Sequence, residues 1–351
     1  MSPSLPPLSI DVPAAWRAGD LAAEAWIHTL TPGEVGEVVA AATAVAARGG
    51  DLAMLREADF PLPTLAPRLA DILHGDVLGG RGFAVIRGLD PTKLDRRQCA
   101  AAFLGLGAHL GNLRPQNAKG HILGHVKDLG RASTDPTARL YQTHERQTFH
   151  TDSCDVVGLM CLRPAKAGGR SSLVSSVTIY NEMRRERPDL ALCLFEPIET
   201  DRRGEQAPGQ APFFNIPVFN WREGHFAAIY QRQYIESARR FPQVPALTGL
   251  QVEALDMLDR LANDPRLSLE IAFKPGDVQL VNNHVLFHDR TAFEDWPEPE
   301  RRRHLLRLWL APPGAQPLPD VFAERFGSVV VGERGGVPAP REQWNAPLDA
   351  E

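Results

Sequence analysis

The chain has 351 residues, of which 43% are hydrophobic, and a formal net charge of −5. This length and apolar content suffice to bury a sizeable core in one large domain or two ordinary ones. Because acidic and basic residues are mixed along the sequence, it lacks the basic field that nucleic acid or an anionic membrane surface requires, and we expect neither as a partner.

The N-terminal residues and the cysteines predict a cytoplasmic protein. The stretch MSPSLPPLSIDVPAAW has neither the basic nor the apolar part of a secretory signal, and 18 uncharged apolar residues never run together. The four cysteines form no CxxC pair, which suits reduced thiols. The first dozen residues are rich in proline and serine, so we expect residues 1–20 to form an arm that is partly disordered.

Helical signals follow this arm. Thr31-Pro32-Gly33-Glu34 combines an N-cap, a proline at the first helical position and a capping glutamate, and Gly49-Gly50 ends the helix. A second helix is predicted from about Thr92 to Leu110, where Gly111 stops it. Between the two helices, GFAVIRGL (82–89) is short and apolar, which is typical of a buried strand.

From about residue 145 the sequence changes to short β-type segments. They are VVGLMCL (156–162), SSLVSSV (171–177), SLEIAF (268–273), DVQLV (277–281) and HLLRLWLA (304–311). The turn sequence KPGD (274–277) predicts a hairpin between the third and fourth segments. A helical insert near 235–266 interrupts them: Leu250, Ala254, Leu258 and Leu261 have helical spacing and Pro265 closes the helix. No repeat or composition break divides residues 21–351, so we predict one α+β domain with a mainly β core.

Three segments carry residues suited to chemistry, and the first is QTFHTDS (147–153). In an extended chain, residues i and i+2 point to the same face, so His150 and Asp152 can converge on one metal ion. Thr151 would then point away. Alone, this pair fits a hydrogen-bonded polar patch at a strand end better than a metal site.

The second segment is NNHVLFHDRTAF (282–293), which directly follows the predicted strand DVQLV. Its histidine His288 lies 136 residues after Asp152 (288 − 152 = 136). Two histidines and one carboxylate leave the remaining metal positions open, as in non-haem iron oxygenases. The same three ligands also suit a zinc-bound water, as in a hydrolase.

The third segment, RHLLRLWL (303–310), reads as an apolar strand with Arg303 and Arg307 on one face. Burying two guanidinium groups is costly unless anions meet them. A guanidinium binds a carboxylate through two hydrogen bonds, so Arg303, 15 residues after His288, is suited to hold a dicarboxylate co-substrate. Pairing of both arginines with internal Asp or Glu is the alternative.

In this order, HxD, GGRSSLVSS (168–176), NNHVLFHDRTAF and RRHLLRLWL (302–310) resemble the taurine dioxygenase-like (TauD/TfdA) family of Fe(II)- and 2-oxoglutarate-dependent dioxygenases. The resemblance covers roughly residues 80 to 312. It implies a double-stranded β-helix, or jelly roll, decorated by helices. It also implies that His150, Asp152 and His288 hold the iron, whereas His284 lies about 13 Å from His288 along a strand and is not a ligand.

The resemblance further implies how the co-substrate is held. 2-Oxoglutarate would chelate the iron through its keto-acid end, with its far carboxylate on Arg303 and on the hydroxyl of Ser175; Ser176 or Thr178 would serve if the alignment shifts. Arg307 matches a position that meets an anionic substrate group in some members. Among the loop residues, Asn117 and Gln142 are candidates to line the substrate pocket.

We therefore expect a catalytic domain that uses Fe(II), O2 and 2-oxoglutarate, releases succinate and CO2, and hydroxylates or otherwise oxidises a C–H bond of a small, possibly anionic, organic molecule. Asp152 disfavours halogenation, because related halogenases have a small residue there. A zinc hydrolase with the same three ligands is one alternative, although it has no evident use for Arg303 and Ser175. A relative that binds a small acid without turnover is another, and the chain could form a homo-oligomer.

Overall fold

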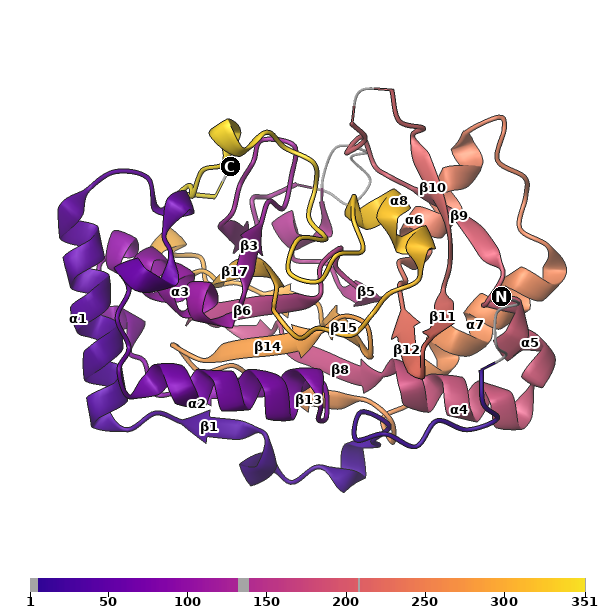
Figure 1. Cartoon of the computed structure of the whole chain (residues 1–351), viewed down its shortest axis with the longest axis horizontal. Helices are drawn as coiled ribbons and strands as arrows, with labels where there is room; N and C mark the ends of the chain where they lie inside the picture. The colour runs from indigo at the N-terminus through magenta and orange to yellow at the C-terminus, as the bar shows by residue number, and fades with distance from the viewer. Residues whose placement is uncertain (1–5, 132–138, 208, 351) are drawn as a thin grey trace.

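The computed structural model of the chain describes residues 6–131, 139–207 and 209–350. Two large β-sheets share one hydrophobic core, and helices cover the outer faces (Figure 1). The presence of helices together with several sheets confirms the predicted α+β class.

The larger sheet has the strand order β1-β2-β14-β6-β17-β3, with β4 also paired to β17. Its pairs are antiparallel except that of β1 with β2. The strands are β1 Ile27–Thr29, β2 Phe83–Arg87, β3 Asn112–Arg114, β4 Gly124–Val126, β6 Val156–Arg163, β14 Val278–Asn282 and β17 His304–Ala311.

The smaller sheet has the order β13-β8-β15-β5, and all its pairs are antiparallel. Its strands are β5 Gln147–His150, β8 Ser171–Ser175, β13 Leu269–Ile271 and β15 Leu286–Arg290. Three further two-stranded pairs are β7 Ala167–Gly168 with β16 Phe293–Glu294, β9 Pro197–Asp201 with β10 Phe213–Pro217, and β11 Phe219–Arg222 with β12 His225–Ala228.

The two faces of the larger sheet belong to different cores. In β17, Leu306, Leu308 and Leu310 pack with the N-terminal helices, whereas Trp309 packs in the core shared with the smaller sheet. The N-terminal helices are α1 Pro32–Arg48, α2 Leu65–Asp71 and α3 Arg96–Leu110. Since alternate residues of a strand face opposite ways, Arg307 lies on the same interior face as Trp309.

The remaining helices lie mostly on the side of the smaller sheet (Figure 1). They are α4 Ser176–Glu186, α5 Pro188–Cys193, α6 Arg232–Ser237, α7 Gly249–Ala262 and α8 Ala323–Phe326. Helix α7 confirms the predicted insert, with Ala254, Leu258 and Leu261 buried. Leu250, in contrast, is 45% exposed, because it lies in the first turn of the helix.

The capping signals place the first helix correctly and the second only in part. The Thr31 hydroxyl accepts a hydrogen bond from Glu34 N (3.3 Å), and helix α1 starts at Pro32 as predicted. Helix α3 starts at Arg96 rather than Thr92, because the carboxylate of Asp95 accepts the hydrogen bond from Gln98 N (2.8 Å). Residues Pro91–Lys93 form a separate 3-10 turn.

The prediction of a hairpin at residues 274–277 is wrong. Strand β13 pairs with β8 in the smaller sheet, whereas β14 pairs with β2 and β6 in the larger one. The turn therefore carries the chain from one sheet to the other. Gly276 adopts a φ of 85° there, and a Cβ on it would lie 1.9 Å from Leu89 O.

The predicted N-terminal arm is held against α4 over its described part. Ile10 and Trp16 are buried, and Ile10 exchanges backbone hydrogen bonds with the side chain of Asn181 (2.8 and 2.9 Å). Residues 1–5 lie outside the described residues. The arm therefore contributes apolar side chains to the core around the smaller sheet.

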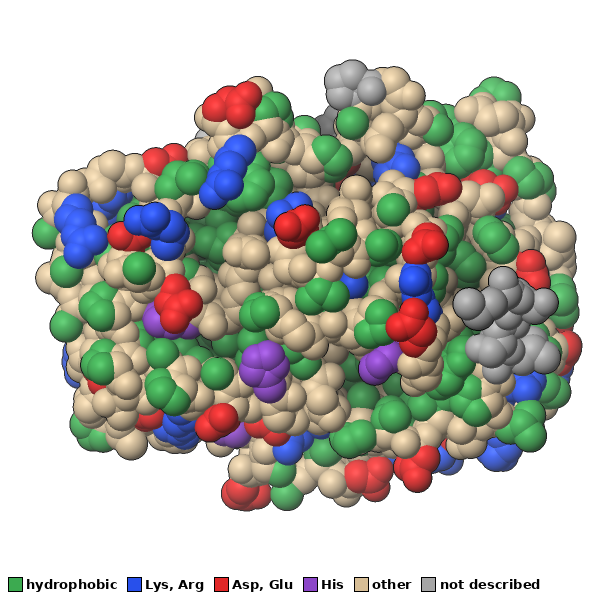
Figure 2. All heavy atoms as spheres, viewed as in Figure 1, with side chains coloured by type: hydrophobic (Ala, Val, Ile, Leu, Met, Phe, Trp, Pro, Cys, Tyr) green, Lys and Arg blue, Asp and Glu red, His purple; other side chains and the backbone are tan. Residues whose placement is uncertain are grey.

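The surface carries charges of both signs. On the face drawn in Figure 2, basic and acidic side chains are interspersed rather than gathered by sign. Within the described ranges, no helix is long and apolar enough to cross a membrane.

Candidate active site

Two histidines face each other across neighbouring strands of the smaller sheet. His150 in β5 is paired with His288 in β15, and their ring centroids are 4.2 Å apart. His150 Nδ1 lies 2.8 Å from Thr148 O, so it donates its proton there. This hydrogen bond leaves Nε2 as the unprotonated nitrogen, which accepts a hydrogen bond from Gln147 Nε2 (2.9 Å).

Asp152 follows the end of β5 and is fixed by contacts to both sheets. Its backbone N–H donates to Asn283 Oδ1 (3.1 Å), in the turn between β14 and β15. Its carboxylate accepts a hydrogen bond from Trp309 Nε1 (2.9 Å) and lies 3.4 Å from Arg307 Nη1. Both donors come from β17 in the larger sheet.

His150, Asp152 and His288 each present one ligand atom, and these atoms lie within 4.8 Å of one another. Burial lowers the pKa of His288 to about 3 and also lowers the pKa of His150. Burial opposes ionisation of Asp152, but the charge of Arg307 and the hydrogen bond from Trp309 hold its pKa below the usual value. Two neutral imidazoles and one ionised carboxylate are the donor set that suits a divalent iron.

A small cavity beside His288 is lined in part by an arginine and a serine side chain. Ser171 in β8 is paired with Arg290 in β15, and both residues line this cavity. Burial, followed by the charge of Arg303, lowers the pKa of Arg290 to about 9. Arg290 Nη1 donates to Thr143 O (2.9 Å), whereas its Nε is buried without a hydrogen-bond partner among the described residues.

Arg303 precedes β17 and is 3% exposed. Its guanidinium packs over Phe293 (5.1 Å to the ring centroid), and Nη2 donates to Gly169 O at 3.4 Å. Nη1 is buried with no partner within the described part of the chain, and burial lowers the pKa of Arg303 to about 10. Arg303 is not among the described residues that line the cavity, but its charge acts on Arg290, which is. The two buried guanidinium groups retain unused N–H donors, which suit an anion such as a carboxylate.

The structure does not bring Ser175 into this cavity. The Ser175 hydroxyl donates to Ala14 O (2.6 Å) and accepts from Thr178 N (2.9 Å), where it caps helix α4. Ser175 lies four residues after Ser171 in β8, so the two residues are about 13 Å apart along the strand. Of the other hydroxyls considered, that of Thr178 donates to Trp16 O (2.8 Å). Among the described lining residues Ser171 is the serine that borders the cavity, and its hydroxyl donates to Gln279 Oε1 (2.9 Å). The sequence prediction of Ser175 needs this correction.

Arg307 faces the interior and is held on both sides. Its Nε donates to Gln116 Oε1 (2.7 Å), and its guanidinium lies over the rings of Tyr141 (4.9 Å) and Trp309 (5.1 Å). With its contact to Asp152, the arginine is both paired internally and exposed to the cavity.

Asn117 and Gln142 lie farther from the histidines than expected. A second cavity, called the main cavity below, also borders His150 and Asp152. Asn117 and Gln142 line a neighbouring hollow that shares Arg139 and Arg307 with the main cavity, but neither lines the main cavity itself. Asn117 Oδ1 accepts from the backbone N of Lys119 (3.0 Å), which orders its own loop.

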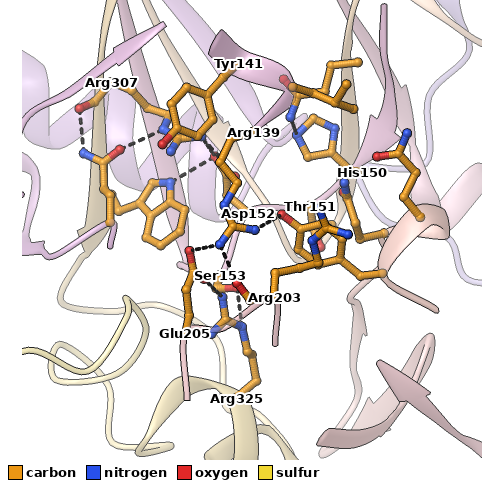
Figure 3. Close-up of a pocket in the computed structure, with 17 residues that line it drawn as sticks. Arg139, Tyr141, His150, Thr151, Asp152, Ser153, Arg203, Glu205, Arg307 and Arg325 are labelled. Carbon is orange, nitrogen blue, oxygen red and sulfur yellow. Dashed lines mark hydrogen bonds and ion pairs between the residues drawn. The ribbon is translucent and has the colours of Figure 1, made fainter. Parts of the chain in front are cut away.

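The main cavity, of about 200 Å³, opens from the side of His150 and Asp152 toward three further arginines (Figure 3). These are Arg139, Arg203 and Arg325, and Glu205 lies among them. No motif singled them out in the sequence, because they come from distant segments and become neighbours only in the fold.

His284 takes no part in this site. Its Nε2 lies 2.7 Å from Asp155 Oδ1, and the same carboxylate accepts from Arg334 Nε (2.8 Å). All three side chains are at most 2% exposed. His284 thus belongs to a buried ion-pair network that ties the C-terminal segment to the loop after Asp152.

Comparison with known proteins decides the family. The family described as "Taurine catabolism dioxygenase TauD, TfdA family" matches residues 47–309. The chain belongs to the TauD/TfdA dioxygenase family. FR-33289 synthase of Streptomyces rubellomurinus is 30% identical over 294 residues, 82% of this chain and 86% of the relative. Taurine hydroxylase-like protein SAT17 of Stachybotrys chartarum is 32% identical over 310 residues, 83% of this chain and 78% of the relative.

Among solved structures, an asparagine oxygenase in complex with Fe(II), 2S,3S-3-hydroxyasparagine and succinate superposes with a TM-score of 0.61 at 19% identity. The alignment covers 81% of this chain and 93% of that one, and shows a shared fold. As a member of the TauD/TfdA family with its His-Asp-His set present, this dioxygenase uses Fe(II) and 2-oxoglutarate to oxidise a small organic substrate. Family membership thereby favours the dioxygenase over the zinc hydrolase and the non-catalytic relative.

Proposed function

We propose that His150, Asp152 and His288 hold the iron and that the enzyme hydroxylates a small anionic molecule in the cavity above them. The convergence of the three ligand atoms within 4.8 Å carries this proposal. Iron with 2-oxoglutarate, when bound, supplies the oxidising power for C–H cleavage. The chain's own residues orient the ligands: Trp309 and Arg307 hold the Asp152 carboxylate, and the Thr148 carbonyl sets the tautomer of His150.

The co-substrate pocket in this proposal is the cationic cavity beside His288. Arg303 and Arg290 would share the far carboxylate of 2-oxoglutarate, and Ser171 replaces Ser175 as the hydroxyl partner. Unused donors on both guanidinium groups support the assignment, because a buried cation without a partner costs stability until an anion arrives.

The order of the strands supports a double-stranded β-helix as the architecture of this catalytic domain. Strands β5, β8, β13 and β15 belong to the smaller sheet, and β6, β14 and β17 to the larger one, so the chain passes repeatedly between the two sheets. The metal ligands come from the smaller sheet and the residues that hold Asp152 from the larger. We propose that the two sheets form one jelly roll with the iron between them.

An anionic substrate follows from the charge of the cavity. Arg307 is one of four arginines among the described lining residues, and the family and one relative are named for taurine, an aminosulfonate. Asn117 and Gln142 would contact only a substrate that extends past Arg139 into the neighbouring hollow.

The free state of the four cysteines supports a reducing, cytoplasmic location.

Anaerobic titration of the protein with Fe(II) and 2-oxoglutarate tests the assignment. We expect a visible charge-transfer band in the wild type and its loss in His288→Gln, because one of three metal ligands is removed. His284→Gln is the matched control, since glutamine can still donate to Asp155, and it should retain the band. Equal loss in both variants would contradict the ligand set. Succinate release on admitting O2 then reports turnover.

A further inference from the structure

Strand β14 carries a buried amide on the face that looks toward the smaller sheet. Val278 and Leu280 pack with the N-terminal helices, whereas Val281 packs in the core shared with the smaller sheet. Since alternate residues of a strand face opposite ways, Gln279 lies on the interior face, and it is 0% exposed. A buried amide lowers stability unless both its donor and its acceptor are paired.

Only one end of this amide is paired within the described chain. The hydroxyl of Ser171, in β8, donates to Gln279 Oε1 (2.9 Å), and β8 and β14 lie next to each other in Figure 1. Gln279 Nε2, in contrast, is buried with no hydrogen-bond partner among the described residues. Ser171 lines the cavity beside His288, whereas Gln279 does not. The amide therefore lies behind Ser171, one contact away from that cavity.

The surroundings of this pair lack acceptors. Arg290, which is paired with Ser171, has a buried Nε without a partner in the described ranges, and the same is true of Arg303 Nη1. Arg303 lies close by, because a Cβ on Gly169 would be 2.9 Å from Arg303 Nε. Together with Gln279 Nε2 these are three buried donors, and a bound anion supplies the acceptor that they lack.

The single proton of a hydroxyl group limits what Ser171 can do. While it donates to Gln279 Oε1, it has no proton left for a carboxylate, which itself offers none. Half a turn of the amide about its last side-chain torsion, which is broad and roughly two-fold, exchanges oxygen and nitrogen. Nε2 then donates to Ser171 Oγ, and the hydroxyl proton becomes free. At most one amide atom lacks a partner in either orientation, so the turn costs little.

We propose that Gln279 is a positioning residue for the co-substrate. Its amide turns when 2-oxoglutarate binds, so that Nε2 donates to Ser171 Oγ and the Ser171 hydroxyl donates to the far carboxylate. Hydrogen bonds are exchanged in this step, and no proton leaves either side chain. The proposal rests on the proposed function, since it adds a residue to the same co-substrate pocket.

Calorimetric titration of the anaerobic, Fe(II)-loaded protein with 2-oxoglutarate tests this role. The quantity of interest is the factor by which Ser171→Ala weakens binding in different backgrounds. With Gln279 present, we expect about 3- to 30-fold, the effect of losing one hydrogen bond to a carboxylate. In Gln279→Glu the factor should fall below about twofold, because an ionised carboxylate accepts the serine proton and has no donor to exchange for it.

Gln279→Met supplies the opposite comparison. Methionine does not compete for the serine proton, so the Ser171→Ala factor should be at least as large as in the wild type. Equal factors with Gln279 and with Gln279→Glu would show that the amide only fills space, and this result overturns the proposal. A negligible factor in the wild type, or a smaller one in Gln279→Met than in the wild type, also overturns it.

Asn282→Leu is the matched control. Asn282 is another buried amide of β14, but it lies on the opposite face, where its Nδ2 donates to Val77 O (3.2 Å). This variant should keep the wild-type affinity for 2-oxoglutarate, whereas Gln279→Glu should weaken binding at least as much as Ser171→Ala does. Equal weakening by Asn282→Leu and Gln279→Glu would mean that any disturbance of β14 has this effect, which overturns the specific role.

The charge-transfer band separates the two proposals. If the band is present but the pattern of factors is not, the role of Gln279 is wrong and the proposed function is retained. If the band is absent but the pattern is present, the iron ligand set fails and the role of Gln279 is retained; without band or binding heat, both fail. Thermal denaturation identifies unfolded variants, and if Gln279→Glu is one of them, the factor in Gln279→Met decides.

Discussion

Single residues with unused hydrogen-bonding groups gather around the candidate site. Arg303 Nη1, Arg290 Nε and Arg325 Nη1 are all buried without a partner in the described ranges. By contrast, Arg334 is equally buried, but it donates hydrogen bonds to Asp155, Gln316 and Val329. The first three lower folding stability, which an anion bound as proposed would restore, whereas Arg334 stabilises the fold itself.

Substitution of the two serines of β8, Ser171 and Ser175, should affect different properties of the enzyme. We expect Ser171→Ala to raise the KM for 2-oxoglutarate by about 3- to 30-fold, because a hydrogen bond to a carboxylate is lost. Ser175→Ala should leave that KM unchanged but lower the free energy of unfolding by about 1 kcal/mol, since it removes the cap of α4. Rates of succinate release and urea unfolding measure both. A higher KM in Ser175→Ala alone would restore the prediction made from the sequence.

At the scale of elements, the turn between β13 and β14 is a tightly constrained connection between the sheets. Gly276 and Gly224 share a φ of 85°, but only at Gly276 would a Cβ meet backbone, 1.9 Å from Leu89 O. Gly224 lies in the β11–β12 turn with no atom within 4 Å of its Cβ position.

These two glycines form a matched pair. Gly224→Ala should cost about 1 kcal/mol, the strain of a left-handed backbone conformation alone. Gly276→Ala should cost about 3 kcal/mol or more, because the backbone must also move away from Leu89. Urea unfolding measures both, and equal losses would mean that the crossing between the sheets is looser than the packing indicates.

Strands were predictable from the sequence, but their partners were not. Apolar runs located β6, β14 and β17, yet a Pro-Gly turn looks the same whether the next strand joins the same sheet or another. For the same reason, alternation puts Ser171 and Ser175 on one face of β8 but cannot tell which of them borders the cavity: Ser171 pairs with Arg290, which lines it, and Ser175 pairs with Leu286. The metal set was predictable from its side-chain types, whereas Arg139 and Arg325, 186 residues apart (325 − 139 = 186), share no local pattern.

At the scale of the whole molecule, the C-terminal segment is tied to the core through a chain of hydrogen bonds. His125 Nε2 lies 2.8 Å from Pro347 O and must donate to it, so its Nδ1 accepts from His304 Nε2 (2.8 Å). His304 Nδ1 in turn accepts from Arg163 (3.5 Å). Every link requires both imidazoles to be neutral.

This arrangement makes stability depend on pH. Burial, then His125, lowers the pKa of His304 to about 3, and burial lowers the pKa of His125. The unfolded chain therefore binds protons first, and the stabilisation present above about pH 6.5 is lost as the pH falls toward 3.

We expect His304 to contribute up to about 2 kcal/mol to the loss of unfolding free energy between pH 7 and pH 5, and His125 to act in the same direction. His304→Gln should flatten this dependence, although it lowers stability at pH 7. Urea unfolding of the wild type and the variant across this range measures the difference. Parallel curves would show that the pair does not titrate as proposed.

The family match ends at residue 309, yet the wall of the main cavity continues to Arg325. In the proposed function, the iron ligands and the arginines for 2-oxoglutarate thus lie within the matched residues, whereas Arg325 lies beyond them. We therefore expect that exchange of the segment after β17 would alter the outer wall of the cavity without altering the residues proposed to hold iron and 2-oxoglutarate. The buried Asp155–Arg334 ion pair limits that exchange, because any replacement segment must still bring a cation to Asp155.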